Sequence, residues 1–558
     1  MPLLAWAGAY LGQEAWWDEI VSLKTFALAG FETTVTHYAG THGNHHTFYN
    51  LVNNLYTWTA GLRNLDAAID GIHWLRLLQL VFALGTVALA FSTATRFLGR
   101  TSGFVSGMIL VTTVPFLNFA LQLRGYSLSM LLTVAVLCCF WDYRRTQRPS
   151  RAVLLTVLSF LLLYTMPGNA YFVLSLIAIA AARLLLRAAK QGLTRPTLLR
   201  DPNAIQLVAL AAGILLFLAA YSPLLDDFLR SRFATARPPV RTYALTSLLP
   251  GVLQAFISFR YALLPLFAIG VIQLLRRRRA CGSHHGAEGE HELRGAECIS
   301  ELAALLLLPF LISLVRGDWP PDRTFVFLAP IWSLLLGAGI GSLPPAIRTV
   351  ERHRLVWGVT LFAYCAGSLL FAYHHVQDQL TDNLHKSVRS QNMLYNYYLS
   401  RAFRPSRDLA PLIVEVSGHP APILLVDEVD RVALGTHLER HALGYYALVS
   451  VREGEEDGAF AYTCLMLRSE RGQAPATRAV TLLSRAPLAP ECRAFSLLYG
   501  YLVREGVISS ADPSFYLVTS FPETAEKLEE HCGHDLEAAN LSGHASYTNV
   551  FRVTGRSR

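Results

Sequence analysis

The sequence predicts a polytopic α-helical membrane protein with a smaller α/β domain at its C-terminal end. Of its 558 residues, 53% are hydrophobic and only 16% are charged, and the mean hydropathy is +0.34. These values are too apolar for an ordinary soluble protein. Apolar runs of roughly 15–22 residues recur along the first two thirds of the chain, as expected of helices that cross a bilayer. After about residue 380 the runs become short and β-rich.

About eleven membrane spans are expected. The apolar segment 2–11 is too short to cross a bilayer, so it is expected to be the end of a first transmembrane helix. The segment 18–74 is amphipathic and rich in His, Asn, Tyr and Trp, which favours a large first loop of interfacial helices. The other spans are expected at residues 75–97, 104–121, 126–141, 153–166, 170–186, 205–225, 261–275, 302–315, 324–340 and 356–373.

The distribution of arginines predicts the orientation of these spans. Arginines cluster in alternate short loops, including 144–151 and 276–279, and the positive-inside rule places such loops in the cytoplasm. The net charge of +8 therefore reflects topology, which argues against nucleic acid as a partner. The remaining loops would face outward from the cytoplasmic (inner or plasma) membrane: 18–74, 122–125, 167–168, 226–260 and 316–323.

Two domains are expected. Residues 1–375 would form the transmembrane domain, and residues 376–558 would form an extracytoplasmic α/β domain on the same side as Asp18. The second region alternates β-rich runs at 422–426, 445–449 and 515–518 with helical stretches such as 523–531.

Two adjacent carboxylates follow two tryptophans near the start of the chain, in Trp16-Trp17-Asp18-Glu19. Tryptophan favours the membrane–water interface, and a carboxylate at bilayer level is a functional candidate by default. Alternatively, Asp18 and Glu19 only begin an interfacial helix, where negative charge suits the helix dipole.

Basic and imidazole groups occupy the same predicted outer face. His45 and His46 lie in the first outer loop and could bind a phosphate or a metal, or form a wet interfacial helix. Arg124 interrupts an apolar stretch from 104 to 141, where a guanidinium could clamp a lipid phosphate or snorkel to headgroups. Arg323 ends a second outer loop and has the same two interpretations.

No cofactor is implied by the sequence. Cysteines and histidines gather in one predicted cytoplasmic loop, but their spacing matches no compact zinc pattern and the loop is rich in Gly and Glu. A divalent metal is therefore possible without being implied. The residues concerned are Cys281, His284, His285, His291 and Cys298.

These motifs together resemble the membrane glycosyltransferases of the GT-C fold. The nearest group is the dolichyl-phosphate-mannose protein mannosyltransferase-like and aminoarabinose-transferase-like proteins, and the resemblance covers about residues 1–375. One departure is that relatives often carry His-Pro-Pro or Asn-His-Pro, whereas this chain has no proline at 44–47. The resemblance is carried by Asp18-Glu19, the His motif before Tyr49, Leu75-Arg76-Leu77, Arg124-Gly125-Tyr126 and the segment 323–330.

The resemblance implies transfer of a sugar from a polyprenyl-phosphate-linked donor to an extracytoplasmic lipid, glycan or protein, with inversion. It implies that Asp18 is the catalytic base and that the substrates contact Glu19, His45, His46, Arg76, Arg124, Tyr126 and Arg323. Membrane lipids would surround the protein. Two other classes stay open, namely a membrane transporter and a membrane-anchored sensor or binding protein that acts through its outer domain.

Overall fold

The computed structural model describes two compact units, and each is considered by itself. The first consists of Met1–Gln13, Val21–Gln377 and Leu384–Asn396, and the second of Glu14–Ile20, Asp378–Asn383 and Tyr397–Arg558. The described residues are 2–13, 15, 17–36, 46–191, 200–230, 242–257, 261, 263–281, 287–317, 320–342, single residues between 362 and 374, Arg504, and seven strands in the region 423–555.

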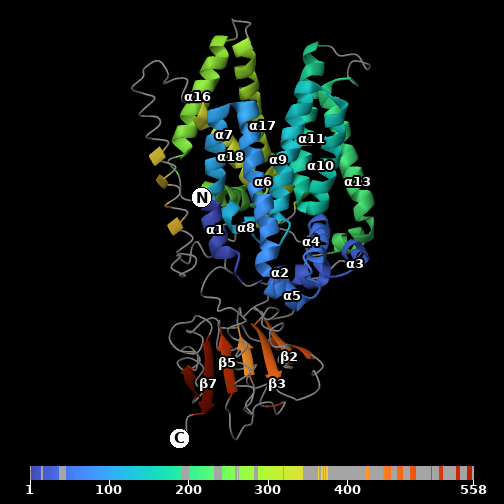
Figure 1. The fold of residues 1–558 in the computed structure, drawn as a ribbon, viewed down its shortest axis with the longest axis vertical. Helices are drawn as coiled ribbons and strands as arrows, with labels where there is room; N and C mark the ends of the chain where they lie inside the picture. The colour runs from blue at the N-terminus through green and yellow to red at the C-terminus, as the bar shows by residue number, and fades with distance from the viewer. Residues whose placement is uncertain are drawn as a thin grey trace. The chain divides into compact units, whose positions relative to one another are not determined.

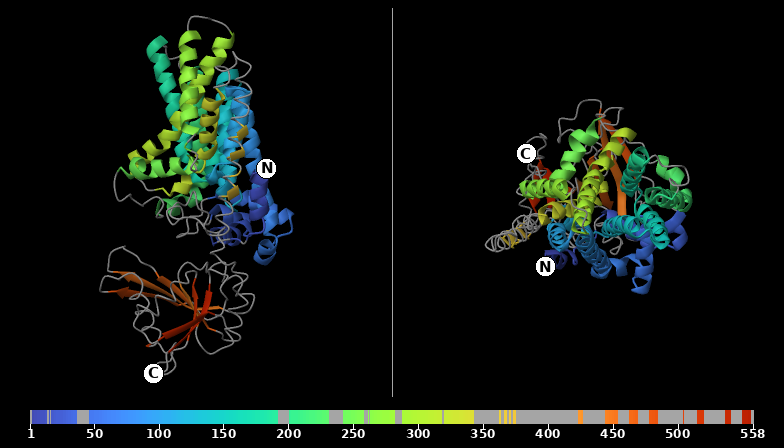
Figure 2. Two further views of the ribbon diagram at one scale, coloured as in Figure 1. Left: turned by 90° about the vertical axis from the view of Figure 1, so that its left-hand side faces the viewer. Right: turned by 90° about the horizontal axis from the view of Figure 1, so that it is seen from above.

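The first unit is a bundle of helices (Figure 1). In the view along the bundle, the long helices are seen nearly end-on and pack side by side (Figure 2). The long helices are α6 (Ile72–Leu98), α7 (Arg100–Val111), α9 (Tyr126–Thr146), α10 (Pro149–Thr165), α11 (Ala170–Gln191), α13 (Pro202–Arg230), α16 (Leu263–Cys281), α17 (Ala287–Arg316) and α18 (Leu328–Gly341). The other elements are α1 (Pro2–Tyr10), η1 (Leu23–Ala27), α3 (Phe31–Thr36), α4 (Thr47–Thr59), α5 (Leu65–Asp70), α8 (Val114–Ala120), η3 (Pro167–Asn169), η4 (Ala244–Leu248), α15 (Leu249–Ile257) and η5 (Asp322–Phe325), and α2 (Trp17–Ser22) crosses the boundary between the units.

The bundle is that of an integral membrane protein. Within the described residues, five helices are long and apolar enough to cross a bilayer, or six if the bent pair α7 and α8 counts as one span. Each of the nine expected runs from 75–97 to 324–340 coincides with a helix or with that bent pair. The expected total of eleven is not confirmed, because α10, α16 and α18 are apolar over only 10–17 residues each and most of 356–373 lies outside the described residues.

The span expected at 104–121 is a broken one, because α7 and α8 are bent by 64° at their junction. Pro115 stands in the first turn of α8 and has no N–H to continue the hydrogen bonding of α7. The hydroxyls of Thr112 and Thr113 donate to the carbonyl oxygens of Met108 and Ile109 at 2.8 and 2.7 Å. These side chains therefore satisfy the carbonyls at the end of α7, where the chain turns.

Short helices follow one another through the predicted first loop, as expected. Those of the first unit, η1, α3, α4 and α5, lie at the end of the bundle where α6 begins (Figure 1). In α4 the polar face is buried and the apolar face is exposed, the reverse of a helix on the surface of a soluble protein. Asn50, Asn53 and Thr57 are buried, whereas Leu55 and Trp58 are 62% and 63% exposed. An apolar face turned outward suits a helix at the membrane interface, where tryptophan is favoured.

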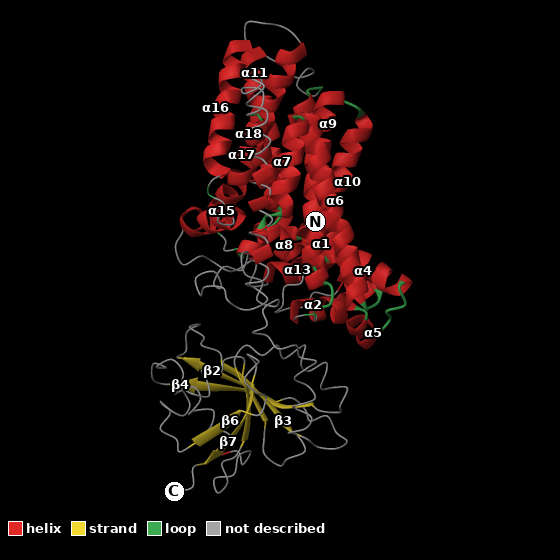
Figure 3. Cartoon of the chain, turned by 60° about the vertical axis from the view of Figure 1, so that its left-hand side comes forward, coloured by secondary structure: helices red, strands yellow, loops and turns green. Residues whose placement is uncertain are grey.

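The described strands of the second unit form one seven-stranded mixed sheet, drawn in yellow in Figure 3. Its order is β4-β2-β3-β1-β5-β7-β6, with parallel pairing of β1 to β5 and β2 to β4 and antiparallel pairing elsewhere. The β-rich runs predicted at 422–426, 445–449 and 515–518 correspond to β1, β2 and β5, while the helical stretch 523–531 lies outside the described residues. The strands are β1 (Ile423–Val426), β2 (Gly444–Glu453), β3 (Tyr462–Arg468), β4 (Arg478–Ser484), β5 (Phe515–Thr519), β6 (Leu536–Asn540) and β7 (Asn549–Gly555).

Candidate functional site

The candidate site begins at the turn between α8 and α9. All seven residues of α8 are buried, and the chain then turns tightly, with the N–H of Arg124 donating to the carbonyl of Gln122 at 2.7 Å. Tyr126 opens α9, and its N–H donates to the carbonyl of Arg124 at 2.8 Å. The turn places Arg124 inside the protein, only 4% exposed. A guanidinium at this depth is costly to bury, so it marks a candidate functional position.

Arg124 contacts His46, the residue that precedes α4. The Nε and Nη2 atoms of Arg124 lie 3.2 and 3.1 Å from Nε2 of His46, which is itself 3% exposed. Because a guanidinium can only donate, Nε2 must accept, and the imidazole is therefore neutral with its proton on Nδ1. The imidazole thus holds the guanidinium in place without neutralising its charge.

Tyr126 completes this group of side chains. Its ring packs edge-on against His46 at a centroid distance of 5.3 Å, and the Cζ of Arg124 lies 5.8 Å from the same ring. Gly125 permits the approach, since a Cβ there would lie 2.7 Å from Nδ1 of His46 and 3.1 Å from Cγ2 of Thr165. The structure therefore brings together His46, Arg124 and Tyr126, three of the residues predicted from the sequence.

A hydrogen-bonded chain supports the group from α6. Nε2 of the fully buried Gln79 donates to the hydroxyl of Tyr49 at 2.9 Å, and Oε1 of Gln79 accepts from Ser127 at 2.6 Å. Tyr49 lies one turn after His46 on α4, and Ser127 follows Tyr126 on α9. Gln79 therefore joins the two segments whose side chains meet at Arg124.

Arg323 is connected to this group of side chains through contacts of α10, η3 and η5. Thr165 ends α10 beside Gly125, and the η3 turn follows it directly. A Cβ on Gly168 in this turn would lie 2.6 Å from Cγ2 of Thr324, so η3 packs against η5. The half-buried Arg323 precedes Thr324 on η5. Arg124 and Arg323 are therefore at the same end of the bundle.

Arg76 contacts the C-terminal end of α1. Its Nη1 donates to the carbonyl oxygen of Tyr10 at 2.7 Å and also to that of Gln13, and its Cζ lies 4.6 Å above the Tyr10 ring. The carbonyls at the end of α1 lack partners within the helix, and a cation at that end also suits the helix dipole. This geometry gives Arg76 a role in holding the end of α1, and the substrate contact expected from the sequence stays a prediction.

The remaining predicted residues stay predictions. Asp18 and Glu19 lie on α2 in the second unit, and Asp18 is half-buried whereas Glu19 is fully buried. His45 lies outside the described residues, as do His284 and His285. Within the described part of the chain, no group of three His, Cys, Asp or Glu residues could hold a metal ion.

Sequence reasoning assigned no role to Gln79, Tyr49 or Ser127. Gln79 gave a signal, because it is a strongly polar residue within an apolar helix and lies one turn after Arg76. Polar side chains inside spanning helices commonly bond across to a neighbouring helix. Tyr49 and Ser127 gave none, since neither residue type is unusual at a membrane interface or in an apolar helix.

No protein-family model matches the chain, and neither does any curated protein. Solved structures do match. ArnT from Cupriavidus metallidurans, bound to undecaprenyl phosphate, is 12% identical, with 99% of this chain and 96% of that chain covered and a TM-score of 0.46. The apo state of the same protein gives 13% identity, the same coverage and a TM-score of 0.49.

The third match is the archaeal oligosaccharyltransferase AglB from Archaeoglobus fulgidus, in complex with an inhibitory peptide and a dolichol-phosphate. It is 10% identical, and the match covers 74% of this chain and 57% of that chain with a TM-score of 0.43. The chain is similar in fold to these GT-C proteins.

Proposed function

We propose that the protein is a glycosyltransferase that moves a sugar from a polyprenyl-phosphate-linked donor to an extracytoplasmic acceptor. The observation that carries the proposal is the buried guanidinium of Arg124, positioned by the neutral ring of His46 at the end of a membrane helix bundle. The motif resemblance of the sequence adds support. The acceptor would be a lipid, glycan or protein of the cell envelope.

Arg124 would bind the donor phosphate. A guanidinium presents several N–H groups in a planar fork, which matches two oxygens of a phosphate. His46 fixes the orientation of that fork, and Tyr126 packs beside both. In a buried setting the electrostatic attraction between guanidinium and phosphate is much stronger than in water. Arg323, on the adjacent η5 turn, would be a second cation for the same phosphate.

The reaction would be a single displacement with inversion. The oxygen of the acceptor hydroxyl would attack the anomeric carbon as the bond from that carbon to the donor phosphate oxygen breaks. The polyprenyl phosphate would leave with the bonding electron pair, and Arg124 would stabilise the charge that develops on it. The hydroxyl proton would pass to Asp18 as general base. Because the leaving group is already a phosphate, a cationic side chain suffices to stabilise it.

The location of the charges favours this function over transport. Transporters usually place substrate-binding groups near the bilayer midplane, at discontinuous helices. Here Arg124 lies where α9 begins and Arg323 lies in the turn before α18 begins, so both are at helix ends. We infer that this end faces outward from the cytoplasmic membrane, because the arginine-rich loops lie at the other ends of α9 and α10.

The test is binding of a polyprenyl phosphate to the purified full chain in detergent, measured by calorimetry. Arg124→Ala is expected to weaken binding by roughly 10- to 100-fold, since a hydrogen bond to a charged group contributes about 1.5–3 kcal/mol. Arg124→Lys should recover only part of the affinity, because an ammonium lacks the fork.

Arg63→Ala is the matched control, because Arg63 is an exposed arginine in the first loop. Unchanged affinity in both Arg124 variants would contradict the proposal that Arg124 binds the donor phosphate. Incubation of membranes with a panel of polyprenyl-phosphate sugars, with release of the carrier as readout, then tests transfer itself. Absence of carrier release with every donor would contradict the transferase activity.

A further inference from the structure

A second cluster of arginines lies at the opposite end of α9. Arg96 from α6 and Arg151 from α10 both contact the buried carboxylate of Asp142 on α9, Arg96 at Oδ1 and Arg151 at Oδ2, the latter at 2.9 Å. Asp142 is 3% exposed, whereas the two arginine side chains are 42% and 39% exposed. Each guanidinium has five N–H groups, so most of its donors remain for a ligand on the exposed side.

Two further arginines flank this contact. Gln147 has a φ of 51°, a left-handed conformation that ends α9 and leads at once into α10. Arg145 and Arg148 lie on either side of Gln147, are exposed, and make no ion pair within the described part of the chain. This corner, made by Arg96, Arg145, Arg148 and Arg151, thus has four arginines and one carboxylate, an excess of three positive charges.

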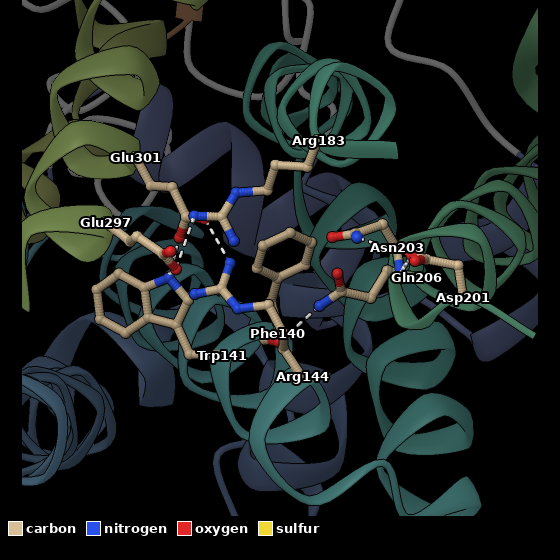
Figure 4. A network of polar contacts seen from close by, with 9 residues as sticks. All are labelled: Phe140, Trp141, Arg144, Arg183, Asp201, Asn203, Gln206, Glu297 and Glu301. Carbon is tan, nitrogen blue, oxygen red and sulfur yellow. Dashed lines mark hydrogen bonds and ion pairs between the residues drawn. The ribbon is translucent and has the colours of Figure 1, made fainter. Parts of the chain in front are cut away.

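In a neighbouring network of ion pairs, the numbers of arginines and carboxylates are equal (Figure 4). Arg144 and Arg183 both contact the buried Glu301, and Arg183 also lies 3.6 Å from Glu297. The indole N–H of Trp141 donates to Glu301 at 2.6 Å. Two arginines therefore face two carboxylates, and their charges cancel. The corner around Asp142 has no such balance among the described residues.

The corner lies at the end of the bundle opposite Arg124, where the positive-inside rule predicts the membrane surface. Asp142 is 16 positions after Tyr126 on α9, which corresponds to about 24 Å along the helix. Exposed apolar side chains occur on the same two helices, with Leu154 one turn after Arg151 on α10 and Phe91 on α6. Cations with an exposed apolar surface directly beside them match an amphiphile with an anionic head and acyl chains.

We propose that this corner binds the phosphate of an anionic phospholipid headgroup, with Arg96, Arg145, Arg148 and Arg151 as the donors. Asp142 positions Arg96 and Arg151 and prevents their mutual repulsion from separating them. Basic pockets between membrane helices bind anionic headgroups through this chemistry. The acyl chains would lie along the exposed faces of α6 and α10. The proposal does not depend on the transferase function, because Arg124 lies at the other end of α9.

The test is native mass spectrometry of the full chain in detergent, titrated with phosphatidylglycerol and with phosphatidylcholine. Phosphatidylglycerol is expected to bind the unmodified protein more tightly. In the double variant Arg145→Gln/Arg148→Gln, the affinity of the protein for phosphatidylglycerol should fall by roughly 30-fold. Each basic residue near the membrane surface raises the affinity for an anionic lipid by about fivefold. Both side chains are exposed and make no ion pair with any described residue, so the melting temperature should change little.

The matched control is Lys190→Gln/Arg200→Gln, which removes two exposed positive charges from the same end of the bundle. Its affinity for phosphatidylglycerol should match that of the unmodified protein. An equal loss in both double variants would mean unspecific attraction and would overturn the site. Equal binding of the two lipids to the unmodified protein would overturn it too. Displacement of the lipid by an equal concentration of inorganic phosphate would assign the corner to free phosphate instead.

Discussion

Nε of Arg124 lies 3.2 Å from Nε2 of His46, although the two residues are 78 positions apart in the sequence. The contact joins the N-terminus of α4 to the turn between α8 and α9. Because the imidazole accepts, it can orient the guanidinium without itself neutralising the charge. The pair is thus suited to hold an anion at a fixed position.

The first prediction concerns His46. His46→Ala should weaken binding of a polyprenyl phosphate by about tenfold, because the guanidinium loses its orienting acceptor. His46→Gln should recover part of the affinity, since the amide oxygen can accept from Arg124. His73→Ala serves as control, because His73 is exposed at the start of α6. Equal affinities of the His46→Ala and His73→Ala proteins would contradict an orienting role for His46.

The second prediction concerns Gln79 as a positioning residue. Gln79→Leu removes both hydrogen bonds that join Tyr49 to Ser127, so His46 and Arg124 would lose their fixed relation. Affinity for the polyprenyl phosphate should fall by about tenfold. The pH dependence of that binding should keep its shape, because Gln79 does not titrate.

Gln206→Leu is the matched control for Gln79. Gln206 is equally buried, on α13, and donates from Nε2 to the carbonyl oxygen of Phe140 at 2.7 Å (Figure 4). Both substitutions should lower the melting temperature by similar amounts, whereas only Gln79→Leu should weaken phosphate binding. If the two variants differ in neither property, Gln79 has a structural role alone.

The sequence predicted the parts of the site that interrupt a strong pattern. Arg124 stands inside an apolar stretch, so its cost of burial made it visible. Tyr126 was predicted as a site residue because it belongs to the same motif, Arg124-Gly125-Tyr126. The positions of most helices were likewise predictable, because apolar runs separated by charged loops leave few alternatives.

Other features depend on contacts that no local pattern encodes. The pairing of Gln79 with Tyr49 and Ser127 requires α4, α6 and α9 to pack together. Arg76 was expected at the substrate through the motif resemblance, and no local pattern indicated that it also contacts the carbonyls at the end of α1. The bend at Thr113 was missed because the apolar run continues unbroken through it, although Pro115 was a local signal.

The third prediction concerns stability at the end of the bundle away from Arg124. Glu301→Ala leaves Arg144 and Arg183 without their buried carboxylate, and removing one partner of a buried ion pair costs about 3–5 kcal/mol. The melting temperature of the purified protein should therefore fall markedly. Asp226→Ala is the control, since its pair with Arg230 is exposed and such pairs contribute about 0–1 kcal/mol. Similar melting temperatures for the two variants would mean that Glu301 is replaceable.

The last prediction concerns Asp18. Its carboxylate is half-buried on α2, while that of Glu19 beside it is fully buried. A general base must reach its substrate, so the more accessible carboxylate is the better candidate. Asp18→Asn keeps the size of the side chain but cannot take the proton of the acceptor hydroxyl. Turnover should fall by roughly 10²- to 10⁴-fold.

Donor binding separates this role from a general effect on the fold. Asp18→Asn should leave the affinity for a polyprenyl phosphate nearly unchanged, because a negative charge does not help to hold a phosphate. Glu19→Gln should reduce turnover less, since a buried side chain would act by supporting α2. Measured at saturating donor, a normal turnover in Asp18→Asn would refute the assignment of the base. A loss of donor binding that parallels the loss of turnover would refute it equally, because it would make Asp18 part of the donor site.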